Sequence, residues 1–131
     1  RAICDFLRDA IFKKVIKLKD KGKSIKTWGY VSDIVTMFFN IILNGKNLTY
    51  NTVGSDYQSI YKVAKTICNS FPKVKLILPK KNIINFKFGL DSKYQIFKAK
   101  NYNQEFKKTL KIGIDEGVQR LIDWNLITLG K

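Results

Sequence analysis

The stretch Lys23-Ser24-Ile25-Lys26-Thr27-Trp28-Gly29-Tyr30-Val31-Ser32-Asp33-Ile34-Val35 decides the fold. Residues 24–30 are rich in β-branched and aromatic side chains, which favours a short extended segment. Ser32 or Asp33 then caps a helix, which ends at Asn44-Gly45. The stretch therefore predicts a strand that leads directly into a helix.

This predicted helix is apolar on nearly every side. A helix of this kind has to be covered on more than one face, which is a demanding requirement in a domain of this size. We therefore expect it to pack against several other elements. Its apolar residues are Ile34, Val35, Met37, Phe38, Phe39, Ile41 and Ile42.

The rest of the chain alternates between helical and extended patterns, with no internal repeat and no linker. Apolar residues recur at helical spacing in further stretches, and short runs rich in β-branched residues lie between them. We therefore expect an α/β or α+β fold with four to five helices and short strands. The expected helices cover 3–18, 55–71, a short stretch from Asp91, and 115–125, and the expected strands cover 48–53, 74–78 and 85–88.

The composition narrows the chemistry that is available. The 131 residues make one domain, 1–131, and no apolar run is long enough to cross a membrane. The chain has no histidine, which excludes Ser-His-Asp and Cys-His catalysis and argues against a zinc site. Cys4 and Cys68 lie far apart on predicted helices, so we expect them to be reduced and buried in a cytoplasmic protein. Because the chain opens on Arg1, we expect a trimmed chain.

The net charge of +15 suggests an anionic partner, such as a nucleic acid, a phosphate-bearing metabolite or a membrane surface. Only three of the 25 basic residues are arginine, and the lysines are spread along the chain. A protein that reads nucleic acid more often clusters arginine with interleaved aromatic residues. We therefore disfavour a small basic nucleic-acid-binding module and keep it as the alternative.

Three segments, in this order, resemble the extended short-chain dehydrogenase/reductase family, whose members modify nucleotide sugars. The opening helix, Arg1–Ala10, is similar to the one that precedes them in the family. Together these parts cover most of the chain and correspond to the C-terminal, substrate-binding part of the family. The three segments are residues 23–35, Thr49-Tyr50-Asn51-Thr52-Val53-Gly54-Ser55 with Ser59-Ile60 and Val63-Ala64, and Leu90-Asp91-Ser92-Lys93 with Ile114–Trp124.

The resemblance implies a site for the diphosphate of a nucleotide sugar. The family has an arginine where this chain has Lys26, on an extended segment beside a helix N-terminus. Lysine keeps the charge but loses the two-pronged geometry of arginine. A second phosphate-binding arginine of the family is missing here, which leaves only Lys87 as a candidate, and Trp28 and Tyr30 would line a base or sugar pocket. The alternative is that the two lysines are solvated and the aromatic residues belong to the core.

Catalysis in the family uses a Tyr-x-x-x-Lys pair, in which the lysine lowers the pKa of the tyrosine. The chain contains two such strings, Tyr61–Lys65 and Tyr94–Lys98, and about one is expected by chance in so lysine-rich a sequence. We interpret both as surface pairs. The glycine-rich loop that binds the pyrophosphate of NAD is also missing. We therefore expect no catalytic, cofactor-binding or metal site in this chain.

The resemblance implies a fragment of an NAD-dependent nucleotide-sugar epimerase or dehydratase of surface-polysaccharide synthesis. NAD(P) would be bound by an N-terminal Rossmann half that these residues lack, so the chain alone would be inactive and would only bind the nucleotide-diphosphate sugar. In the family, the strand equivalent to Tyr50–Val53 joins the edge of the NAD-binding sheet, and the helix from Asp33 packs near it. We therefore expect an exposed strand edge and an apolar patch, covered by self-association or by rearrangement.

Overall fold

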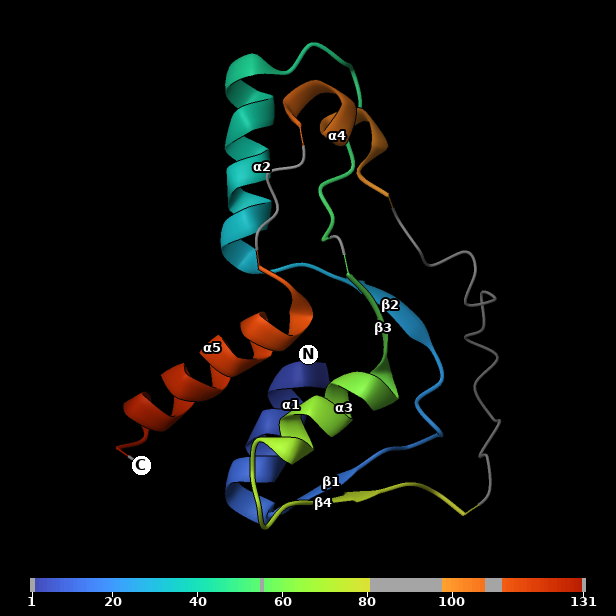
Figure 1. Ribbon diagram of the computed structural model, residues 1–131, viewed down its shortest axis with the longest axis vertical. Helices are drawn as coiled ribbons and strands as arrows, with labels where there is room; N and C mark the ends of the chain where they lie inside the picture. The colour runs from blue at the N-terminus through green and yellow to red at the C-terminus, as the bar shows by residue number, and fades with distance from the viewer. Residues whose placement is uncertain (1, 55, 81–97, 108–111, 131) are drawn as a thin grey trace.

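The computed structural model describes residues 2–54, 56–80, 98–107 and 112–130. These residues form a mixed α/β fold with five α-helices and short strands, as the sequence predicts (Figure 1). The elements in chain order are α1 (Ala2–Arg8), the π-helix η1 (Asp9–Lys13), β1 (Val15–Lys17), β2 (Ile25–Trp28), α2 (Val31–Asn44), β3 (Asp56–Ser59), α3 (Ile60–Asn69), β4 (Lys75–Ile77), α4 (Lys100–Phe106) and α5 (Ile114–Thr128).

The lower part of the molecule in Figure 1 holds the larger core. There α1 and α3 lie next to the parallel pair β1–β4, in which Ile16 stands opposite Leu76. The amphipathic face of α3 contributes Val63, Ala64 and Ile67, and α5 closes the core from one side. The buried members of this core are Leu7, Ala10, Ile16, Leu18, Val63, Ala64, Ile67, Val74, Val118 and Ile122.

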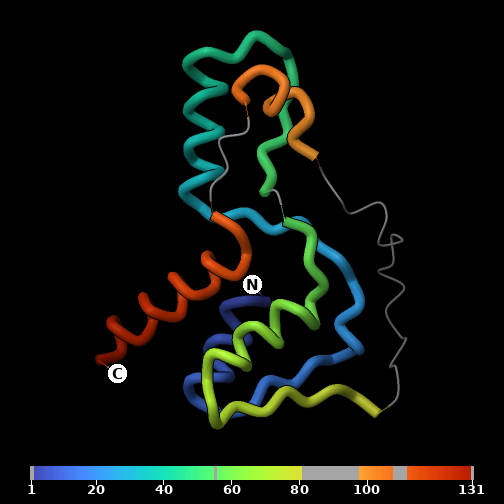
Figure 2. Tube along the Cα trace, viewed as in Figure 1, coloured from blue at the N-terminus to red at the C-terminus, as the bar shows by residue number. Residues whose placement is uncertain are grey.

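The upper part of the molecule is a smaller body made of α2, α4 and the segment between α2 and β3 (Figure 2). Its buried residues are Met37, Ala99 and Tyr102, and Tyr50 and Phe106 pack around them. The ring centroids of Tyr102 and Phe106 are 4.9 Å apart. This second cluster fixes the inner face of α2.

The antiparallel strand pair β2–β3 connects the two parts. Lys26 stands opposite Gln58, and Trp28 stands opposite Asp56. The sequence prediction of an extended segment at 24–30 followed by a helix is therefore confirmed. The predicted helix cap is wrong, because α2 begins at Val31 after Tyr30, with no side-chain cap.

Two predictions for the N-terminal region differ from the structure. The helix expected over 3–18 ends at Lys13, since Lys14 takes a left-handed conformation with φ of 55°. The next residues form β1, whose pairing with β4 buries Ile16 completely. Cys4, expected to be buried, is exposed, whereas Cys68 is half-buried.

The region between α2 and α3 also differs from the prediction. Residues 48–53, expected as a strand, have no regular structure, and the strand lies at Asp56–Ser59 instead. Helix α3 starts at Ile60, later than predicted, because the hydroxyl of Ser59 accepts a hydrogen bond from the Lys62 N–H and caps it. The predicted strand 74–78 and helix 115–125 are confirmed as β4 and α5.

Helix α4 is an element that the sequence did not predict. The expected strand at 85–88 and most of the short helix expected from Asp91 lie outside the described residues. No helix among the residues that the structure describes is long and apolar enough to span a membrane.

Candidate functional site

The end of β2, the start of α2 and the segment before β3 line the open pocket that contains Lys26. The pocket has a volume of about 480 Å³. Lys26 is half-buried, and β2 holds its backbone by pairing with Gln58. The pocket is lined by Lys26, Thr27, Gly29, Ile34, Thr52, Val53 and Gly54. We call it the Lys26 pocket.

Gly54 sets the width of the Lys26 pocket. A Cβ atom at this position would collide with the carbonyl oxygen of Trp28 and with the Cα of Gly29. Only glycine therefore lets residues 52–54 lie directly against the end of β2. The close approach of the two backbones places Thr52 and Val53 in the same pocket as Lys26.

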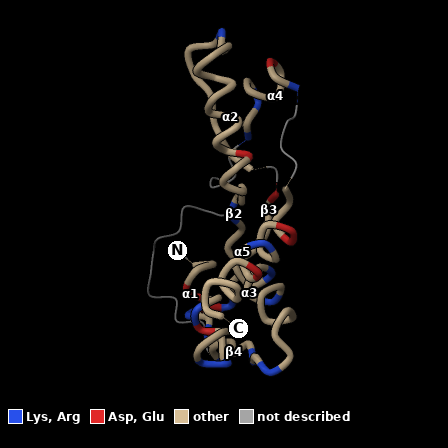
Figure 3. The backbone as a smooth tube through the Cα atoms, turned by 90° about the vertical axis from the view of Figure 1, so that its left-hand side faces the viewer, with Lys and Arg blue, Asp and Glu red and all other residues tan. Residues whose placement is uncertain are grey.

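The amino group of Lys26 is available to a ligand. Within the described ranges, ion pairs form between Arg8 and Asp5, Lys13 and Asp9, and Arg120 and Glu116, and Lys26 takes part in none. A half-buried lysine that lines a pocket and has no ion pair within these ranges is suited to an anion. Figure 3 shows Lys and Arg at both ends of the molecule, so the positive charge is not confined to this pocket.

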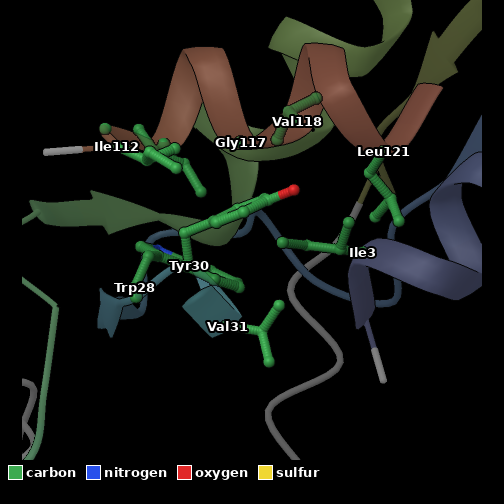
Figure 4. A pocket seen from close by; sticks show the side chains of 11 residues that line it. Ile3, Trp28, Tyr30, Val31, Ile112, Gly117, Val118 and Leu121 are labelled. Atoms are coloured by element: carbon green, nitrogen blue, oxygen red, sulfur yellow. The ribbon is translucent and has the colours of Figure 1, made fainter. Parts of the chain in front are cut away.

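Trp28 lies on the same strand as Lys26 but lines a different pocket. This second pocket has a volume of about 210 Å³ and is mostly apolar. The Trp28 indole N–H donates a hydrogen bond to the carbonyl oxygen of Gln58, at 2.9 Å, and the ring packs against the lower core. The pocket is lined by Ile3, Trp28, Gly29, Tyr30, Val31, Ile112, Gly113, Ile114, Gly117, Val118 and Leu121 (Figure 4).

Tyr30 crosses this apolar pocket, and Gly117 of α5 makes room for it. A Cβ at Gly117 would be 2.9 Å from Cδ2 of the tyrosine ring. The guanidinium carbon of Arg120 lies 5.7 Å from the ring centroid, within the range of a cation–π contact. Glu116 accepts hydrogen bonds from Arg120, which raises the pKa of the arginine. The sequence analysis did not predict these contacts of Tyr30. No local pattern indicates that Tyr30 meets Gly117 and Arg120, which lie far away in the sequence.

Two carboxylates, one on α2 and one on β3, bind backbone N–H groups at the start of α5 and just before it. Asp33 accepts a hydrogen bond from the backbone N–H of Ile112 at 2.9 Å, and Asp56 accepts one from the N–H of Ile114. Asp33 is 8% exposed. Its role as a helix cap is therefore wrong, since the carboxylate binds a segment from the far end of the chain.

The other residues singled out by the sequence do not line the Lys26 pocket or lie outside the described residues. Lys87, Tyr94 and residues 90–93 lie outside the described residues, so the structure places none of them relative to Lys26. Tyr61 and Lys65 both lie on α3, where the tyrosine is half-buried and the lysine exposed. No group of three or more His, Cys, Asp or Glu residues suited to a metal ion occurs in the part of the chain that the structure describes.

Comparisons with known proteins identify relatives of this chain. It is 25% identical over 123 residues to the dTDP-glucose 4,6-dehydratase of Shigella flexneri. This alignment covers 90% of this chain and 34% of the relative. The dTDP-glucose 4,6-dehydratase of Bacillus anthracis, solved with NAD, superposes with a TM-score of 0.76 at 15% identity. WbmF of Bordetella bronchiseptica, solved with NADH, superposes with a TM-score of 0.78 at 17% identity.

The superpositions cover 99% of this chain, but only 40% of the B. anthracis protein and 38% of WbmF. The chain thus spans about a third of the length of the curated relative that it matches. No family model matches the sequence. The relatives and the fold agree with the resemblance of the three sequence segments. The chain is therefore related to the extended short-chain dehydrogenase/reductase family of NAD-dependent sugar-nucleotide enzymes, and it matches one part of such a protein.

Proposed function

We propose that this chain binds a nucleotide-diphosphate sugar in the Lys26 pocket, as the substrate-binding part of an NAD-dependent nucleotide-sugar dehydratase or epimerase. The observation that carries the proposal is that Lys26 lines an open pocket between two backbone segments and forms no ion pair with any residue that the structure describes. The name of the Shigella relative, a dTDP-glucose 4,6-dehydratase, supports the substrate class.

The proposed contacts follow from the chemistry of the substrate. The Lys26 ammonium group donates hydrogen bonds to the diphosphate, and Lys87 provides a second positive charge for it. Trp28 has its indole N–H already bound to Gln58, so it offers the apolar face of its ring to the base or the sugar. The pocket lined by Trp28 adjoins the Lys26 pocket at Gly29, which lines both.

In this proposal, the 131 residues supply binding and no redox chemistry. NAD is bound by a Rossmann module outside them, and the enzyme works in the cytoplasm on precursors of surface polysaccharides. The NAD- and NADH-bound states of the two solved proteins support this division, because each of them extends well beyond the part that the chain matches.

Isothermal titration of the purified chain with dTDP-glucose and UDP-glucose tests the proposed function. Lys26→Ala removes a charge-assisted contact worth about 1.5 to 3 kcal/mol, so we expect affinity to fall roughly 10- to 150-fold. Lys65→Ala is the matched control, since Lys65 is an exposed lysine on α3. Equal affinity of the Lys26→Ala variant and the wild-type chain would refute the Lys26 contact.

The same purified chain distinguishes the alternative function. A basic nucleic-acid-binding module would bind arbitrary DNA or RNA with an affinity that falls steeply as salt is added. Strong, salt-sensitive binding of nucleic acid together with no saturable binding of either sugar nucleotide would replace the proposed function by this alternative.

A further inference from the structure

The Thr27 hydroxyl group has no hydrogen-bond partner among the residues that the structure describes. Thr27 follows Lys26 on β2, and its Oγ1 atom is buried. Folded proteins give most buried hydroxyl groups a partner, because a buried donor without one lowers the stability of the fold. The neighbouring strand supplies none, although Tyr57 of β3 stands opposite Thr27 in the register. The packing of the described chain therefore leaves this hydroxyl group unexplained.

Thr27 is also one of the residues that line the Lys26 pocket. Lys26 precedes it and Gly29 follows it on one side of the pocket, and Gly54 comes from the segment on the other side. The pocket therefore contains a lysine and a threonine that are adjacent on a strand. Phosphate oxygens accept hydrogen bonds from both kinds of side chain.

We propose that Thr27 donates a hydrogen bond to a phosphate oxygen of the diphosphate that Lys26 binds. This inference rests on the proposed function and adds an uncharged donor to the same site. Lysine is a point charge on a flexible side chain, so it does not fix the direction of a phosphate group. The threonine hydroxyl is close to the backbone of a paired strand, so it holds one phosphate oxygen in a defined position.

A rotation about χ1 brings the hydroxyl group of Thr27 to the ligand. The Cβ atom carries a hydroxyl and a methyl group, and a change of staggered rotamer lets the methyl group take the buried place of the hydroxyl. This change breaks no hydrogen bond within the described chain, because the hydroxyl forms none there. An apolar methyl group needs no partner in the buried place. Ligand binding therefore gains a hydrogen bond at Thr27 without the loss of another.

Thr27→Val tests this contact, because valine has nearly the shape of threonine and lacks the hydroxyl group. In isothermal titration of the full 131-residue chain, we expect its affinity for dTDP-glucose and for dTDP to fall about 10-fold or more. Both ligands carry the diphosphate, so the two losses should be equal. Thr27→Ser keeps the hydroxyl group and should bind both ligands within about 3-fold of the wild-type chain.

The Thr27→Val variant should also be more stable than the wild-type chain when no ligand is present. Valine has no polar group to bury, so we expect calorimetry to show a Tm that is higher by about 3 °C or more. Thr66→Val is the matched control, since the Thr66 hydroxyl on α3 donates a hydrogen bond to Asp115 at 3.2 Å and lies outside the Lys26 pocket. The control should not raise the Tm and should leave the affinity unchanged. A purely structural role for Thr27 would not combine a higher Tm with weaker binding.

The results that overturn the Thr27 contact differ from the result that overturns the proposed function. Equal affinity of Thr27→Val and the wild-type chain, with binding lost in Lys26→Ala, removes the Thr27 contact and leaves the proposed function standing. A loss of affinity for dTDP-glucose but not for dTDP places the contact away from the diphosphate and overturns it. A Tm of Thr27→Val no higher than that of the wild-type chain overturns it too, because the hydroxyl then has a partner in the free protein. If the wild-type chain binds neither ligand, the proposed function itself fails, and the Thr27 contact fails with it.

Discussion

Gly54 shows how a single missing side chain shapes the Lys26 pocket. The atoms that a Cβ would meet are the backbone of Trp28 and Gly29, and backbone has no alternative rotamer by which to move aside. A larger residue therefore has to push residues 52–54 away from β2. Because Lys26 and residues 52–54 line the same pocket, this movement opens the pocket on one side.

The Gly54→Ala variant should therefore lose both stability and binding. We expect the free energy of unfolding to fall by about 1 to 3 kcal/mol, the usual cost of overpacking, when it is measured by urea denaturation. Affinity for a sugar nucleotide should fall in the same variant. Thr52→Ala is the control, since it removes atoms from the same pocket instead of adding them. A Gly54→Ala protein as stable as Thr52→Ala would contradict this explanation.

Individual site residues could be predicted only where a local pattern marks them. Lys26 could be named because it lies in a strand–helix stretch with a recognisable order of residues, and the structure does place it at a pocket. The bond between Asp33 and Ile112 joins residues 79 positions apart, and the contact between Gly117 and Tyr30 also joins two distant segments. No local signal in the sequence reports such pairs, so Asp33 was interpreted as a cap.

At the scale of elements, a small polar network fastens the turn after α2 to α4. Tyr50 donates a hydrogen bond to Glu105 at 2.6 Å, and the same carboxylate accepts bonds from the Lys46 N–H and the Asn47 side chain. The hydrogen bond from Tyr50, followed by those from Lys46 and Asn47, holds the pKa of Glu105 below the usual value of a glutamate. Ionised Glu105 is thus stabilised in the folded protein.

The depressed pKa of Glu105 sets the direction of a pH dependence. The stabilisation is fully present above the pKa of an unfolded glutamate, about 4.3, and is lost as the pH falls through the lower pKa of the folded state. We expect Glu105→Gln to be less stable than the wild-type chain at pH 7, and the difference to shrink below pH 4. Guanidinium unfolding of both proteins at several pH values measures this difference in the free energy of unfolding. A difference that grows on acidification would show that the sign is wrong.

The length and the apolar pattern of each element explain which elements could be predicted from the sequence. Helices α3 and α5 bury one stripe of apolar residues each, and that period can be read without the fold. Strand β1 is three residues long, and its partner β4 lies 60 positions away, so Val15 and Leu18 were interpreted as the end of a helix. Helix α4 is mostly polar, with Tyr102 as its one buried residue, and gives little periodic signal.

At the scale of the whole molecule, the described residues form two clusters of unequal size. The lower core has ten buried residues contributed by α1, η1, β1, α3, α5 and the segments around them. The upper cluster has three, Met37, Ala99 and Tyr102, and depends on α2 and α4. Local opening is easier where fewer apolar contacts are broken. The upper part should therefore open without unfolding the lower part.

Native-state hydrogen exchange measures this difference in local stability. We expect the amides of α4 to exchange through a local opening of lower free energy than the amides of α3 around Ile67, which follow global unfolding. Met37 and Ile67 are both fully buried, which makes them a matched pair. Met37→Ala should speed exchange in α4 and leave α3 nearly as protected as before. Ile67→Ala should lower protection in both parts, because it removes about 2 to 5 kcal/mol of packing from the core on which the whole molecule depends. Equal effects of the two variants on α3 would mean that the two clusters unfold as one unit.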